Sequence, residues 1–197
     1  LARGKDEEYM DDDDMRIIKK ATPEGELFVK VTEGRVKTLR MEDRDFTSRF
    51  VTFYLIDYRD YAPDMDSFMS KGMRKIYDLN EAQIEKIKAD WRKALNTAYS
   101  IFGNDAFRKR FDLNESRKPI NKALFDSIST SFAKLSIEQC NVLIDRKEEF
   151  RKKIMDLHNS SDGKFIRALT QGTALKANVI QRFSDIENII NETLQGI

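Results

Sequence analysis

Cysteine is almost absent from this sequence of 197 residues, and Cys140 is its only thiol. A single cysteine excludes an internal disulfide and favours a reducing compartment. Cys140 falls in a stretch with helical periodicity. We interpret it as a small core residue, with a nucleophile as the alternative.

Long apolar runs are missing as well. No stretch approaches the roughly 18 apolar residues that a membrane-spanning helix needs. The first residues lack the basic, apolar and small-residue pattern of a signal peptide. We therefore expect a cytoplasmic protein without a membrane partner.

Histidine and clustered glycine are the other scarce features. The only histidine, His158, has no local ligand partner, which argues against a zinc site. The eight glycines are scattered and form no phosphate-binding loop. The sequence thus predicts no catalytic residue, no cofactor and no metal. An enzyme with an unrecognised pair of carboxylates stays open as an alternative.

Charges of the two signs nearly cancel, with 35 Lys and Arg against 34 Asp and Glu, so the net charge of +1 implies no polyanionic partner. Residues 1–14, however, hold seven acids and two bases. Repulsion between these acids predicts a flexible acidic segment over residues 1–14, followed by a single helical domain over residues 15–197. Metal binding by the run from Asp11 to Asp14 is the weaker alternative. Because the chain begins at Leu1 and not at a methionine, we expect a fragment of a longer protein or a processed product.

The stretch 40–61 carries the densest aromatic stripe. Phe46, Phe50, Phe53, Tyr54 and Asp57 share one face if the stretch is helical at about 100° per residue. We expect the rest of the chain to pack around this helix, and the carboxylate within the stripe to need a partner.

Apolar residues recur at helical spacing along most of the remaining chain, and no strand is convincing. Capping boxes at Asn80 with Gln83 and at Ser136 with Gln139 mark two helix starts, and Pro119 is expected to open another. The predicted fold is all-α, a compact multi-helix bundle of about seven or eight helices. Besides 40–61, the main helices are expected over residues 23–33, 63–78, 80–102, 119–135, 136–158 and 173–195. Short helices are expected over 104–111 and 164–170, with a helical turn at 15–21.

Four polar residues lie on apolar faces and predict a buried structural network: Arg49, Asp57, Asn121 and Arg182. An unpaired buried guanidinium is costly, so Arg182 is expected to reach a carboxylate or helix-end carbonyls, with Asp57 as a candidate partner. Asn121 is expected to satisfy backbone groups. The alternative is that each arginine extends along its own stem to water.

Basic residues gather around a predicted loop, with Phe107 and Phe111 among them. Such a patch fits contacts to phosphates or to an acidic protein surface, and a merely solvated face is the alternative. The nucleic-acid-binding candidates are Arg108, Lys109, Arg110, Arg117, Lys118 and Lys122.

Several short motifs resemble, in order and spacing, the helical region of the GmrSD-type restriction-system family, long catalogued as a domain of unknown function. The match runs from residue 26 to residue 194. Its motifs are Arg40-Met41-x-Asp43, Arg49-Phe50, Tyr61-x-x-x-x-Asp66-x-Phe68, Ala106-Phe107-Arg108, Ile120-Asn121-x-Ala123-Leu124-Phe125, and Thr173 with Arg182-Phe183.

The resemblance implies a bacterial defence protein directed at nucleic acid. In that family the catalytic part is an N-terminal ParB-like or sulfiredoxin-like domain with an Asp-Gly-Gln-Gln-Arg type motif. This domain is linked to nucleotide hydrolysis and DNA cleavage, and some members add an HNH-type nuclease. Here the pair Asp162-Gly163 continues as Lys-Phe, and one histidine cannot supply an HNH site. No catalytic residue is therefore carried over.

Two functions follow as expectations. The first is a non-catalytic helical domain that packs against the N-terminal catalytic domain of a GmrSD-like anti-phage protein and contacts DNA. The second is a stand-alone helical module for protein interaction or homo-oligomerisation.

Overall fold

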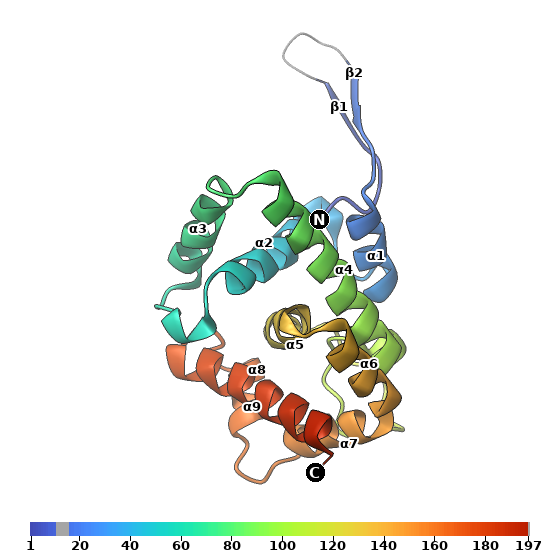
Figure 1. The fold of residues 1–197 in the computed structure, drawn as a ribbon, viewed down its shortest axis with the longest axis vertical. Coiled ribbons are helices and arrows are strands. Elements are labelled where there is room, and N and C mark those ends of the chain that lie inside the picture. Colours follow the sequence, from blue (N-terminus) through green and yellow to red (C-terminus); the bar gives the residue numbers. More distant parts are fainter. Residues whose placement is uncertain (11–15, 197) are drawn as a thin grey trace.

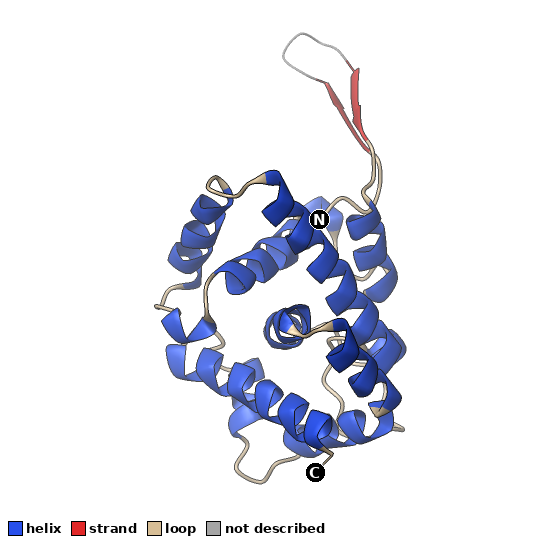
Figure 2. Ribbon diagram, viewed as in Figure 1, coloured by secondary structure: helices blue, strands red, loops and turns tan. Residues whose placement is uncertain are grey.

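A computed structural model describes residues 1–10 and 16–196, and it is an all-α body with one projecting β-hairpin (Figures 1 and 2). The all-α prediction is confirmed. The nine α-helices of the described part are α1 (Pro23–Val31), α2 (Glu42–Leu55), α3 (Met65–Ile76), α4 (Glu81–Phe102), α5 (Lys122–Lys134), α6 (Ile137–Asp145), α7 (Lys147–His158), α8 (Lys164–Thr170) and α9 (Lys176–Gln195). Three short 3-10 helices are η1 (Thr38–Arg40), η2 (Tyr58–Asp60) and η3 (Gly103–Asp105).

Helix α5, rather than the aromatic stretch 40–61, is the element around which the others pack. Every residue from Ala123 to Ala133 is buried, and α5 contacts α2, α4, α8 and α9. Figure 1 shows α5 in the middle of the body, surrounded by the other helices. Apolar residues cover a wide arc of this helix, as expected for a helix buried between neighbours.

The aromatic stripe of α2 packs directly against this central helix. The ring of Phe46 meets that of Phe125 edge-on with 4.9 Å between centroids, and Phe50 meets Trp91 of α4 at 4.7 Å. Edge-to-face aromatic pairs contribute about 0.5–1.5 kcal/mol beyond the apolar area they bury. The stripe thus fixes how α2 and α4 sit against α5.

A second aromatic cluster joins α2 and α3 to α9. Phe53 lies 4.8 Å from Phe183 and 5.0 Å from Phe68, and Tyr58 stacks on Phe183 at 4.6 Å. Because Tyr58 belongs to η2, the chain has already left the helix at this point. The predicted helix over 40–61 therefore ends early, at Leu55.

Local capping signals placed most helix ends. Both capping boxes form, at Asn80 with Gln83 and at Ser136 with Gln139. Besides the early end of α2, three boundaries were wrong. Helix α5 begins at Lys122 instead of Pro119, the predicted helix 136–158 divides into α6 and α7 at Arg146, and α9 starts at Lys176 instead of residue 173. The predicted helix over 104–111 is not formed; only η3 lies there, followed by an isolated bridge between Arg108 and Ile120.

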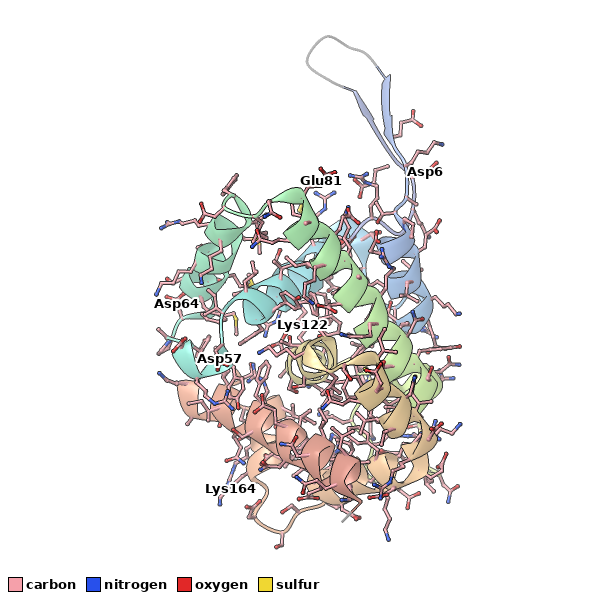
Figure 3. All side chains as sticks on the ribbon, in the orientation of Figure 1. Asp6, Asp57, Asp64, Glu81, Lys122 and Lys164 are labelled. Atoms are coloured by element: carbon pink, nitrogen blue, oxygen red, sulfur yellow. The ribbon has the colours of Figure 1, made fainter. Side chains whose placement is uncertain are left out.

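The hairpin consists of β1 (Glu7–Met10) and β2 (Arg16–Lys19), paired antiparallel with Glu7 opposite Lys19. It corrects the prediction of a helical turn over 15–21, because Arg16–Lys19 form a strand. The predicted boundary between residues 14 and 15 lies outside the described residues. At its base Asp6 accepts from the Ala21 backbone N–H at 2.9 Å and from Lys20 Nζ at 2.8 Å (Figure 3). The candidate metal ligands Asp11 to Asp14 lie outside the described residues.

None of the described helices is both long enough and apolar enough to cross a membrane.

Candidate functional site

Two buried arginines share one carboxylate at the centre of the body. Arg49 of α2 donates through Nε to Asp126 Oδ1 at 2.9 Å and also through Nη2 to Oδ2, and Arg182 of α9 donates to Oδ2 at 3.3 Å. The side chains of Asp126 and Arg182 are fully buried, and that of Arg49 is 11% exposed. Of the four residues predicted for one buried network, Arg49 and Arg182 meet at Asp126, and their hydrogen bonds join α2, α5 and α9.

Asp57 does not take part in this network, which corrects the predicted Arg182 partner. Its carboxylate accepts from the Arg59 backbone N–H at 2.8 Å and from the Arg59 guanidinium at 3.2 Å, at the start of η2. Asp57 fell on the predicted stripe only because the helix was extended beyond Leu55. The true partner, Asp126, was missed although it lies in the helix whose residues 123–133 are all buried, where a carboxylate needs a cation.

The charges of the buried network are not balanced, since two guanidinium groups meet one carboxylate. Arg182 also donates to the Thr173 carbonyl at 2.6 Å, and its Nε has no hydrogen-bond partner among the described residues. Burial and the neighbouring Arg49 lower the pKa of Arg182, whereas Asp126 outweighs burial and raises the pKa of Arg49. These side chains hold the helices in position. Their polar atoms are either hydrogen-bonded to another part of the chain or buried.

Asn121 caps the central helix as expected. Its side-chain oxygen accepts from the Leu124 backbone N–H at 2.8 Å, and its Nδ2 donates to the Leu169 carbonyl at 2.9 Å. The prediction that Asn121 satisfies backbone groups is confirmed, and it also ties α5 to α8.

Two of the predicted nucleic-acid-binding residues turn toward the protein. Arg108 donates to the carbonyls of Asn104 at 3.1 Å and Lys118 at 2.7 Å, and only 7% of its side chain is exposed. Arg110 donates to the Glu115 carbonyl at 2.7 Å and pairs with Asp105 at 3.2 Å. Both arginines hold the 103–120 connection in place.

The other cations of the predicted patch lie nearer to solvent. Arg117 pairs with Glu33 at 2.7 Å and Lys118 with Glu115 at 3.1 Å. Lys122, at the start of α5, pairs with Asp45 at 2.7 Å (Figure 3). Lys109 is half-buried and has no ion pair within the described residues.

A groove of about 610 Å³ brings part of this patch together with a residue that sequence reasoning missed, Arg35. It opens beside the connection between α1 and α2, residues 32–41. The missed signal was the three basic residues Arg35, Lys37 and Arg40 between two predicted helices. The groove is lined by Glu33, Arg35, Val36, Glu42, Phe46, Arg108, Arg117, Lys118, Pro119, Ile120 and Lys122.

A second groove, of about 400 Å³, lies on the other side of the same connection and shares Val36 with the first. Its cationic residues are Lys5, Lys37 and Arg40. Arg35, Lys37 and Arg40 are exposed, and none of the three side chains has an ion pair within residues 1–10 and 16–196. The two grooves and the connection form one surface, which we call the connection face.

Unusual backbone conformations gather at this face. The non-glycine residues with positive φ in the described chain are Glu33 at 52°, Met41 at 55° and Phe107 at 62°. Glu33 lines the first groove, while Met41 and Phe107 directly precede the lining residues Glu42 and Arg108. Such conformations cost free energy and are found preferentially at functional sites, so they single out this face.

The sequence candidates for chemistry lie in the core. His158 is buried between Phe111 and Phe165, its Nδ1 is 2.8 Å from the Ile154 carbonyl, and burial lowers its pKa. Cys140 is buried, with its thiol against the Phe132 carbonyl. Within the described residues, no group of three or more His, Cys, Asp or Glu side chains is arranged to hold a metal ion.

Comparison of the chain with protein-family models, with curated proteins and with solved structures gave no match.

Proposed function

We propose that this chain is the non-catalytic helical domain of a bacterial GmrSD-like anti-phage restriction protein. In this proposal the helical body supports a separate nuclease and nucleotide-hydrolysing domain outside these residues, and the connection face contacts the DNA backbone. The resemblance supports this assignment. Three residues of its motifs, Arg49, Asn121 and Arg182, make hydrogen bonds that hold distant parts of the helical body together.

The observation that carries the DNA contact is the charge of the connection face. Its two grooves are lined by eight cationic residues and two carboxylates, in a chain whose net charge is only +1. Phosphate contacts from lysine and arginine supply most of the non-specific affinity for DNA. Arg35, Lys37 and Arg40 are exposed cations without an internal ion pair in the described chain, so a phosphate does not have to break an ion pair to contact them.

The test replaces these three residues together, Arg35→Gln, Lys37→Gln and Arg40→Gln, and measures binding of a random-sequence DNA duplex by fluorescence anisotropy across a salt series. We expect the slope of log K against log salt to become shallower by about 3, because each lost phosphate contact removes about 0.9. Glutamine keeps a polar side chain and adds no negative charge beside Glu33 and Glu42. Arg108 is unsuitable for this test because it holds backbone carbonyls.

The matched control replaces three exposed lysines outside both grooves, Lys147→Gln, Lys152→Gln and Lys176→Gln. This variant has the same net charge as the first, so it isolates position from total charge. Equal losses in the two variants would contradict a defined DNA-binding face.

A second candidate function, a stand-alone protein-interaction or oligomerisation module, is favoured by the hairpin. Within the described residues its two strands pair only with each other and project away from the helices (Figure 2). Unpaired strand edges are sites where another chain can add a strand. Tight self-association without DNA binding in the same preparations would favour this candidate.

A further inference from the structure

Glu33 occupies a position in the first groove that resembles that of a bound anion. Its two carboxylate oxygens accept from Arg117 Nη1 at 2.8 and 2.7 Å, and Oε2 also accepts from Arg108 Nη2 at 3.2 Å. The hydrogen bond from Arg117 lowers the pKa of Glu33, so the group is ionised near neutral pH. A negative oxygen cluster between two guanidinium groups is also how proteins hold phosphate.

One of the two arginines is positioned independently of Glu33. Arg108 is fixed by the carbonyls of Asn104 and Lys118, and its backbone is set by the left-handed conformation of the buried Phe107, whose ring packs on Phe125 at 4.8 Å. Its Nη2 therefore points into the groove whether or not Glu33 is present. A donor that needs no rearrangement lowers the entropic cost of binding an anion.

The remaining cations of the groove are free to exchange partners. The side chains of Arg117 and Lys122 are 47% and 45% exposed, and Arg35 has no ion pair among the described residues. Exposed ion pairs contribute only about 0–1 kcal/mol each, so a doubly charged ligand can replace their carboxylate partners. The groove volume of about 610 Å³ far exceeds the space that one carboxylate fills.

We infer that the first groove binds a phosphate group, and that Glu33 occupies the anion position until the phosphate takes over Arg117. Arg108 is the fixed donor, while Arg117, Lys122 and Arg35 close on the ligand. The phosphate belongs either to a nucleic-acid backbone or to a free phosphorylated small molecule. The first source rests on the proposed function and the second does not.

The test is Glu33→Gln, which keeps the size and shape of the side chain and removes its charge. Isothermal titration calorimetry with pyrophosphate, and anisotropy with a short DNA duplex, measure the two sources separately. We expect Glu33→Gln to tighten binding by about tenfold, because a negative charge at hydrogen-bond distance from the ligand site is lost. The matched control is Glu148→Gln on α7, which removes one negative charge from an exposed carboxylate paired with Arg151. It should leave both affinities unchanged.

A second variant locates the site. Arg117→Gln should abolish binding of pyrophosphate, and in the unmodified chain pyrophosphate should shift the backbone amide signals of Gly34 and Val36 in NMR spectra. Both residues lie on the connection face, so shifts confined elsewhere would overturn the inference even if binding occurs.

The two proposals fail in distinguishable ways. DNA binding that is equal in the unmodified chain and in Glu33→Gln, with no binding of pyrophosphate, overturns the phosphate site and leaves the DNA-binding face standing. Pyrophosphate binding that tightens in Glu33→Gln while DNA does not bind supports the site, assigns it to a small phosphorylated ligand and contradicts the proposed DNA contact. Absence of both kinds of binding overturns both.

Discussion

The arginines inside the body and those on the connection face carry the same charge but meet opposite environments. Arg49 and Arg182 share the buried Asp126, and their hydrogen bonds hold three helices together. Arg35 and Arg40 are exposed and have no ion pair within the described chain. A buried charge must be compensated during folding, whereas an exposed one keeps its hydration and stays available to a ligand. The two groups should therefore respond oppositely in stability and in binding.

Removing the shared carboxylate should have the largest effect. Asp126→Ala leaves two buried guanidinium groups without an anion, and we expect the free energy of unfolding to fall by about 3–5 kcal/mol. Urea denaturation followed by circular dichroism measures the change. The matched control is Asp57→Asn, which keeps the cap of η2 and removes only a partly exposed pair with Arg59, so its cost should be below about 1 kcal/mol. Comparable losses from the two variants would mean that the buried network does not organise the helices.

His158 is a third case, a buried titratable side chain without a paired carboxylate among the described residues. Burial lowers the pKa of His158 below its ordinary value of 6.5, so the folded chain binds fewer protons than the unfolded chain. Protonation of His158 should therefore not affect the free energy of unfolding well above pH 6.5. As the pH drops below that value, the free energy of unfolding should fall. Urea midpoints at several pH values for the unmodified chain and His158→Phe measure the difference. A parallel pH dependence in both proteins would show that His158 does not cause it.

The smallest effect on stability is expected from the connection face. Arg35→Gln, Lys37→Gln and Arg40→Gln together should leave the urea midpoint nearly unchanged, because exposed side chains without ion pairs contribute little to folding. The same variant is expected to lose DNA affinity, so the two measurements together separate a binding role from a folding role. A large drop in the urea midpoint would show that these three cations contribute to folding, as Arg49 and Arg182 do.

Local signals in the sequence were sufficient for most helices. Asn80 with Gln83, and Ser136 with Gln139, predict helix starts because the interacting groups are three residues apart and need no other part of the chain. The burial of Arg182 was also predictable, since it interrupts an apolar stripe. Its partner was not, because Asp126 lies 56 residues away and only the packing of α5 against α9 brings the two together.

The hairpin and the connection face could not be predicted from local sequence signals. The strand Arg16–Lys19 is recognised only when Glu7–Met10 pairs with it across a run of acids that local reasoning assigns to a solvated segment. Arg35 and Arg117 are 82 positions apart in the sequence and line one groove only because the 103–120 connection folds back beside the end of α1.

By itself, the sequence determined the helical class, most helix starts and the presence of arginines on apolar helix faces, because these depend on periodicity and on groups a few residues apart. The tertiary structure decided which helix is central, which carboxylate the buried arginines share and which cations remain accessible. Those outcomes depend on contacts between distant segments, and such contacts exist only once the helices have packed.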